Sequence, residues 1–92
     1  MQSKLISRNV TVNGRRTSLR LETATWDALD QICSNEKTTV HKLCSMIEDV
    51  RFGSSRTSTV RAFIVTYFRL AANRAGAVNG MADKALTEFK NS

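Results

Sequence analysis

Apolar and polar residues alternate with a period of two through the first quarter of the chain, on both sides of the dipeptide Asn13-Gly14. Asn and Gly tolerate the positive φ that a two-residue hairpin turn needs at both central positions. We therefore predict a β-hairpin over residues 5–21, with a tight turn that places Val12 opposite Arg15.

This pairing divides the hairpin into two faces, because successive side chains of a strand point to opposite sides. The first face is mainly apolar, and we expect it to pack in the core. It holds Ile6, Val10, Val12, Thr17, Leu19 and Leu21. The second, which we name the comb face, holds Ser7, Asn9, Thr11, Arg16, Ser18 and Arg20. Arg8 falls on the apolar face, and we expect it near the fraying start of the strand.

After the hairpin the apolar period changes to 3.6 residues, which predicts helices over about residues 24–35, 39–50 and 58–74. Their apolar stripes are Trp26, Leu29, Ile32 and Cys33, then Val40, Leu43, Cys44 and Ile47, then Val60, Phe63, Ile64, Tyr67, Phe68 and Ala71. The fold class is therefore α+β, mainly α. We expect one domain over residues 1–75 and a C-terminal extension over 76–92 that allows a short helix.

Hydroxyl side chains stand where each predicted helix begins and can cap its first turn. The candidates are Thr23 or Thr25 for the first helix, Thr39 for the second, and Thr57 or Ser58 for the third. Between the first two helices, Asn35 is the residue we expect to take a left-handed conformation if one is needed.

The formal net charge of +6 is unevenly distributed, since residues 1–22 carry +4 and residues 51–74 carry +5. Most of the basic residues are Arg, whose planar guanidinium suits phosphates and guanine edges. This distribution favours a polyanionic partner. A basic face that only keeps the protein soluble is the alternative. Arg51, Arg56 and Arg61 likewise have two interpretations: contacts with flanking phosphates, or a solvated helix face.

Several classes of function find no support. Cys33 and Cys44 are too few for a disulfide framework and fall at apolar helical positions, so we expect core residues in a reducing, cytoplasmic protein. His41 is the only histidine, which argues against a metal site. We expect no enzyme activity and no cofactor, because neither paired catalytic groups nor a Gly-rich phosphate loop is present. No apolar run is long enough for a membrane span, and no secretory signal is visible.

The order strand, helix, helix resembles the ribbon-helix-helix family of bacterial and phage DNA-binding proteins. The similarity rests on Arg16 to Glu22, Trp26 to Ile32 and Thr39 to Leu43. It extends over residues 10–70 to a subgroup with an extra hairpin strand and a third helix. The resemblance implies a homodimer whose two strands pair into an antiparallel β-ribbon in the major groove of nucleoid DNA.

The resemblance also implies roles for particular residues. Base contacts fall on Arg16, Ser18 and Arg20, and phosphate contacts on Thr39, Val40, His41 and Lys42. Further flanking contacts fall on Asn9, Thr11 and Arg15. The helix start suits a phosphate because its first backbone amides are free and carry partial positive charge.

A physical argument supports the same dimer, because a hairpin strand with one unpaired edge is a template for a second copy of itself. We therefore expect a sequence-specific DNA-binding protein, most simply a transcriptional repressor. The alternative is an antitoxin or another interaction module, whose segment over residues 76–92 would bind a partner protein.

Overall fold

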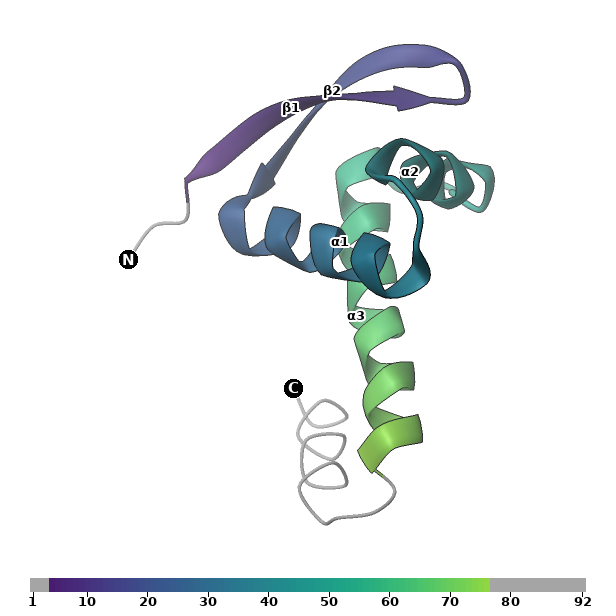
Figure 1. Ribbon diagram of the computed structural model, residues 1–92. Coiled ribbons are helices and arrows are strands. Elements are labelled where there is room, and N and C mark those ends of the chain that lie inside the picture. The colour runs from purple at the N-terminus through teal and green to yellow at the C-terminus, as the bar shows by residue number, and fades with distance from the viewer. Residues whose placement is uncertain (1–3, 77–92) are drawn as a thin grey trace.

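The computed structural model describes residues 4–76 of the chain. Strands β1 (Leu5–Val12) and β2 (Arg15–Glu22) form a two-stranded sheet, which is followed by helices α1 (Thr23–Glu36), α2 (Val40–Asp49) and α3 (Arg56–Gly76). The hairpin lies across one end of the molecule with the helices beneath it, and α3 extends away from the other elements (Figure 1). Residues 77–92, on which the antitoxin alternative depends, lie outside the described residues.

The predicted hairpin register is confirmed at every pair. Val12 lies opposite Arg15 and Ile6 opposite Leu21 in an antiparallel arrangement. The turn has φ of 49° at Asn13 and 82° at Gly14. Two positive φ values in a two-residue loop match the twist of the flanking strands, which explains why this dipeptide sets the register.

One apolar core joins the hairpin to all three helices. Its buried members are Val10, Val12, Leu19, Leu21, Trp26, Leu29, Ile32, Cys33, Leu43, Cys44, Ile47 and Val60. The predicted stripes of α1 and α2 are confirmed, with Val40 partly buried. Two predictions were wrong. Ile6 is 41 % exposed near the open end of the hairpin, and Ala71 is exposed because α3 has by then passed the other elements (Figure 1).

We predicted residues for three helix caps and for the left-handed position between α1 and α2, and only the cap of α2 agrees with the structure. Thr39 caps α2 as expected, since its Oγ1 accepts from the Lys42 backbone N–H at 3.1 Å. At the start of α1, however, the cap position is Glu22, and neither Thr23 nor Thr25 fills it. Thr25 instead donates its hydroxyl hydrogen to Glu22 Oε1 at 3.0 Å. The helix therefore begins directly after β2, with no room for a separate threonine cap.

The other two differences have the same kind of cause. Helix α3 begins at Arg56, and Ser55 Oγ accepts from the Ser58 backbone N–H at 3.1 Å, so that neither Thr57 nor Ser58 is the cap. The left-handed residue between α1 and α2 is Lys37, with φ of 54°, because Asn35 still lies within α1. Helices α1 and α3 extend one or two residues beyond the predicted boundaries, which transfers these roles to neighbouring residues.

Candidate nucleic-acid interface

Helix α2 covers the outer edge of β1 next to the turn. The Thr11 backbone N–H donates to His41 Nδ1 at 3.0 Å, and the Asn13 backbone N–H donates to Ser45 Oγ at 2.9 Å. The Asn13 side-chain amide also donates to Asp49 Oδ1 at 3.1 Å. These bonds satisfy backbone groups that an edge strand would otherwise leave open.

The outer edge of β2 is open. In an antiparallel pair, two residues that lie opposite each other direct their backbone N–H and C=O groups either both inward or both outward. The Thr11 backbone N–H points outward, toward α2. The backbone N–H and C=O of Arg16, which lies opposite Thr11, therefore also point outward, from the other edge of the hairpin. The same direction recurs at every second residue, that is, at Ser18, Arg20 and Glu22. Within residues 4–76, no backbone hydrogen bond from another element reaches this edge.

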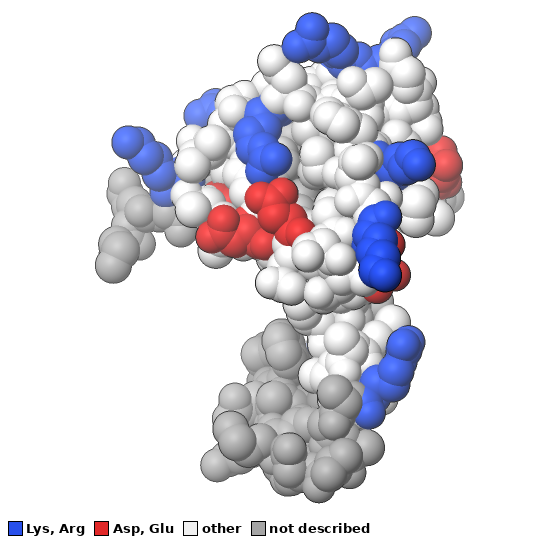
Figure 2. All heavy atoms as spheres, in the orientation of Figure 1, with Lys and Arg blue, Asp and Glu red and all other residues white. Residues whose placement is uncertain are grey.

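The three residues predicted to contact bases lie together on the comb face. Arg16, Ser18 and Arg20 are all exposed. Figure 2 shows basic side chains over the hairpin end of the molecule, whereas the acidic side chains visible in this view lie lower, over the helices. Ser18 Oγ is 2.6 Å from Ser7 Oγ across the hairpin, a contact that the alternation of residues alone does not predict. The comb face therefore presents one guanidinium group on each side of the Ser18 hydroxyl, which is held in place by Ser7.

The flanking residues divide between two positions. Asn9 is exposed and Thr11 half-buried on the comb face of β1, next to the central residues. Arg15 is exposed at the turn, but its register opposite Val12 places it on the core-facing side of the hairpin. Arg15 therefore does not join the comb face, and any contact that it makes has to be beside the turn.

The predicted phosphate site lies at the first turn of α2, beside the comb face. Thr39, His41 and Lys42 are exposed there and Val40 is half-buried. Thr39 accepts the Lys42 N–H, whereas the Val40 and His41 N–H groups, at the first two helical positions, have no acceptor within the helix. An open groove follows this junction of β1 and α2; it is lined by Thr11, Gly14, His41, Lys42, Ser45 and Met46.

His41 connects the phosphate site to the hairpin. Its Nδ1 accepts the Thr11 N–H, so in the neutral ring the proton lies on Nε2. The ring is exposed, which leaves this Nε2–H able to donate to an oxygen outside the protein. One imidazole thus has an inner contact that fixes its orientation and an outer donor beside the free amides of α2.

Arg8 does not lie at a frayed strand end, which corrects the prediction. Its guanidinium carbon lies 4.4 Å from the centre of the Trp26 ring, and Nη1 lies 3.4 Å from Asp30 Oδ2. The Trp26 Nε1–H donates to the Ile6 carbonyl at 2.8 Å. An arginine is tolerated on the apolar face because it covers an indole ring and keeps its charge near a carboxylate.

Three arginines around α3 are held in ion pairs. Glu48 Oε1 accepts from Arg56 Nε at 2.8 Å, and its Oε2 lies 2.8 Å from Arg51 Nη2. Hydrogen bonds from Arg51 and then Arg56 lower the pKa of Glu48 to about 2. Arg61 Nη2 lies 3.0 Å from Glu22 Oε2. Arg56 and Arg61 therefore join α3 to α2 and β2, and Arg51 joins the end of α2 to the loop that follows it, where it also donates to the Ser54 carbonyl.

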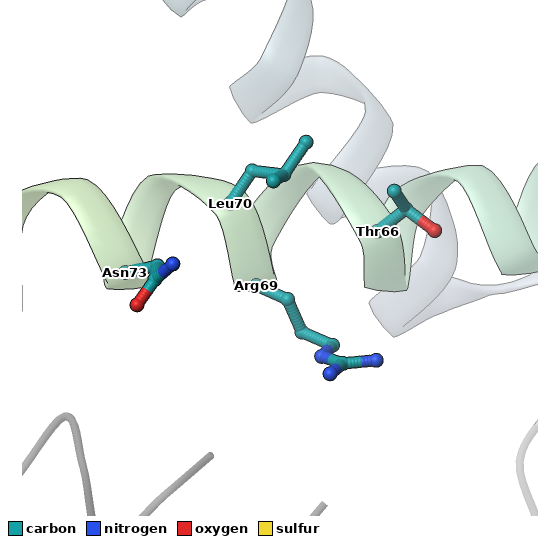
Figure 3. A pocket seen from close by; sticks show the side chains of 4 residues that line it. All are labelled: Thr66, Arg69, Leu70 and Asn73. Atoms are coloured by element: carbon teal, nitrogen blue, oxygen red, sulfur yellow. The ribbon is translucent and has the colours of Figure 1, made fainter.

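The described residues outside the comb face and the α2 start include two buried cysteines and a shallow hollow on α3. Cys33 and Cys44 are free and buried, as predicted, and burial raises the pKa of Cys44 to about 11, so its thiol stays protonated. Among residues 4–76 no group of His, Cys, Asp and Glu side chains is arranged to hold a metal ion. None of the described helices has the length and apolar character that crossing a membrane requires. A shallow hollow along α3, formed by Thr66, Arg69, Leu70 and Asn73, lies on a different element from the comb face (Figure 3).

Comparison with known proteins bears on this interface. Comparison with curated proteins and with solved structures gave no match. The family model described as the ribbon-helix-helix domain matches residues 5–68, which include the whole hairpin, α1, α2 and most of α3. Members of this family are in general DNA-binding transcription regulators or antitoxins. On the strength of this match and of the strand–helix–helix order, the chain belongs to the ribbon-helix-helix domain family.

Proposed function

We propose that this chain is a sequence-specific DNA-binding protein, acting as a transcriptional repressor. Two copies pair through their β2 strands and insert the resulting ribbon into the major groove. One observation carries the proposal: the strand that bears Arg16, Ser18 and Arg20 has an open edge, whereas α2 covers the opposite edge of the hairpin next to the turn. The groups suited to reading bases and the backbone groups suited to pairing therefore belong to the same residues.

The dimensions of such a ribbon suit DNA. Adjacent strands lie about 4.8 Å apart, and the major groove is about 12 Å wide. Two central β2 strands therefore fit within the groove. The two β1 strands lie on the outer sides of the β2 strands. Three strand spacings place them about 14 Å apart, so that Asn9 and Thr11 meet the walls of the groove. This geometry supports flanking contacts for the β1 residues and base contacts for the β2 residues.

Each residue then has a role set by its chemistry. Arg16 and Arg20 donate to base edges, for which guanine O6 and N7 are the best acceptors, and Ser18 donates or accepts between them. The Val40 and His41 amides, the His41 Nε2–H and the Lys42 ammonium group receive a backbone phosphate, with Thr39 holding the helix start in place. The first set discriminates between sequences, and the second gives affinity that depends on salt.

The test compares Arg20→Ala with Arg74→Ala, which removes the same charge from an exposed position near the far end of α3. Preferred duplexes are first selected from random sequences with the unmodified protein, and both variants are then titrated on a selected and a scrambled duplex. Loss of one good Arg–guanine pair lowers discrimination by about 5- to 150-fold. We expect this loss for Arg20→Ala alone. An equal loss on both duplexes would show that Arg20 does not read bases.

A further inference from the structure

The open edge of β2 restricts how two copies can pair. Only its even-numbered residues direct backbone N–H and C=O groups outward, as the bonds from Thr11 and Asn13 to α2 imply for the opposite strand. In a two-fold antiparallel pair, an outward residue of one copy has to face an outward residue of the other. Two registers satisfy this rule with the longest overlap. One is centred on Ser18 and pairs residues 15–21; the other is centred on Leu19 and pairs residues 16–22.

The charges at the even-numbered positions of β2 separate these two registers. Centring on Ser18 places Arg16 opposite Arg20 of the partner subunit, twice by symmetry. Centring on Leu19 places Arg16 opposite Glu22 of the partner subunit, and Arg20 opposite Ser18 of the partner subunit. Opposite charges that face each other across strands stabilise a sheet, and like charges destabilise it. The charge pattern therefore favours the register centred on Leu19.

The apolar face gives the same answer independently. Centring on Ser18 sets Leu21 opposite Arg15 of the partner subunit, next to the buried core. Centring on Leu19 sets Leu19 opposite its own copy at the two-fold axis and Leu21 opposite Thr17 of the partner subunit. Leu19 and Leu21 are 3 % and 0 % exposed, so their cross-strand neighbours need to be compatible with a dry interior.

We propose that two copies of this chain pair their β2 strands in the register centred on Leu19, with Arg16 bound to Glu22 of the partner subunit. The inference rests on the ribbon dimer of the proposed function and specifies its interface. Glu22 has acceptor capacity for this contact on Oε2. Its Oε1 accepts from Thr25 at 3.0 Å and from Arg61 Nε at 3.1 Å, whereas Oε2 accepts from Arg61 Nη2 at 3.0 Å, and each carboxylate oxygen has about two acceptor sites. Arg16 then determines the register, and its guanidinium, which has five N–H donors, keeps donors for a base edge beside Glu22 of the partner subunit.

Disulfide formation between exposed comb-face positions distinguishes the registers. Two variants, Ser18→Cys and Arg20→Cys, carry tags of different length and are oxidised separately and as a mixture, without DNA. Directly opposite residues have Cα atoms about 5.5 Å apart, within disulfide range, whereas the diagonal neighbours lie about 7–8 Å apart. The unmodified protein is the control, because Cys33 and Cys44 are buried.

We expect a cross-linked heterodimer in the mixture and little cross-linking in either variant alone. Efficient cross-linking of Ser18→Cys alone would show the register centred on Ser18, and that of Arg20→Cys alone would show one centred on Arg20. Either result overturns the proposed register but leaves the ribbon dimer intact. Absence of cross-linking in all three samples would show that the β2 edges do not pair. DNA binding of the unmodified protein, measured separately, tests the proposed function itself.

A second measurement tests the charge pair. Arg16→Gln removes both Arg16–Glu22 contacts of the dimer, and Arg74→Gln removes the same charge at a distance from the ribbon. We expect the dimer dissociation constant, measured by sedimentation, to rise about 2- to 30-fold for Arg16→Gln and to stay unchanged for Arg74→Gln. An unchanged dissociation constant for Arg16→Gln would overturn the role given to Arg16.

Discussion

His41 holds the edge of the hairpin against α2, and its removal should weaken the fold and the interface together. His41→Ala deletes the acceptor of the Thr11 N–H, which is 3.0 Å from Nδ1. A typical intramolecular hydrogen bond contributes about 0.5–1.5 kcal/mol net. Thr11 is only half-buried, so water can replace the ring and the lower part of this range applies. We expect a loss of about 0.5–1 kcal/mol, which lowers Tm by about 2–8 °C in a domain of this size.

The assay combines thermal unfolding, followed by circular dichroism, with DNA titration. His41→Asn is the informative companion, because the Asn Oδ1 occupies nearly the position of Nδ1 and can accept from Thr11, whereas nothing replaces Nε2–H. We expect His41→Asn to recover most of the lost Tm but to bind DNA as weakly as His41→Ala. Lys42→Ala is the control. Among the described residues its exposed side chain forms no hydrogen bond or ion pair with the hairpin, so its Tm should stay unchanged while its affinity for all duplexes falls.

Two results would refute this reasoning. If His41→Ala unfolds at the same temperature as the unmodified protein, the contact with Thr11 does not stabilise the hairpin. If His41→Asn is stable and also binds DNA with full affinity, the outer nitrogen does not contact a phosphate.

Two further variants test other contacts. Thr39→Ala removes the acceptor of the Lys42 N–H and should cost about 1 kcal/mol in urea unfolding, whereas Thr39→Ser, which keeps the hydroxyl, should cost much less. Glu48→Gln tests the arginine pairs through pH. Because the folded pKa of Glu48, about 2, lies below its ordinary value of 4.5, the carboxylate stabilises the fold above the unfolded pKa and loses this effect as pH falls toward 2. The variant should therefore be less stable at pH 7, and the difference should shrink between pH 4.5 and 2; a gap independent of pH would contradict the assignment.

The hairpin was predictable in detail because its determinants are local. Asn13 and Gly14 specify the turn, and the period of two then assigns every residue to a face. The buried stripes of α1 and α2 followed from spacing in the same way. The comb face was predictable for this reason too, since it depends only on register.

The contacts that complete the site depend on tertiary structure, which the sequence pattern does not contain. Arg8 lies on Trp26 because the hairpin folds back over α1, and no local rule pairs residues so far apart. His41 reaches Thr11 for the same reason, through the packing of α2 on β1. The capping residues were predicted wrongly for a different reason. A shift of one residue at the start of α1 transfers the cap from Thr23 to Glu22, so a correct helix does not ensure a correct cap.

The position of Trp26 makes the molecule its own optical probe. It is the only tryptophan in the chain, its indole N–H is bound to the Ile6 carbonyl, and a guanidinium group covers its ring. If the open end of the hairpin lifted away from α1, the indole would lose both neighbours and enter water. Its emission would then shift to longer wavelength while the helices stayed folded. Fluorescence can therefore follow separation of the hairpin from the helices without any added label.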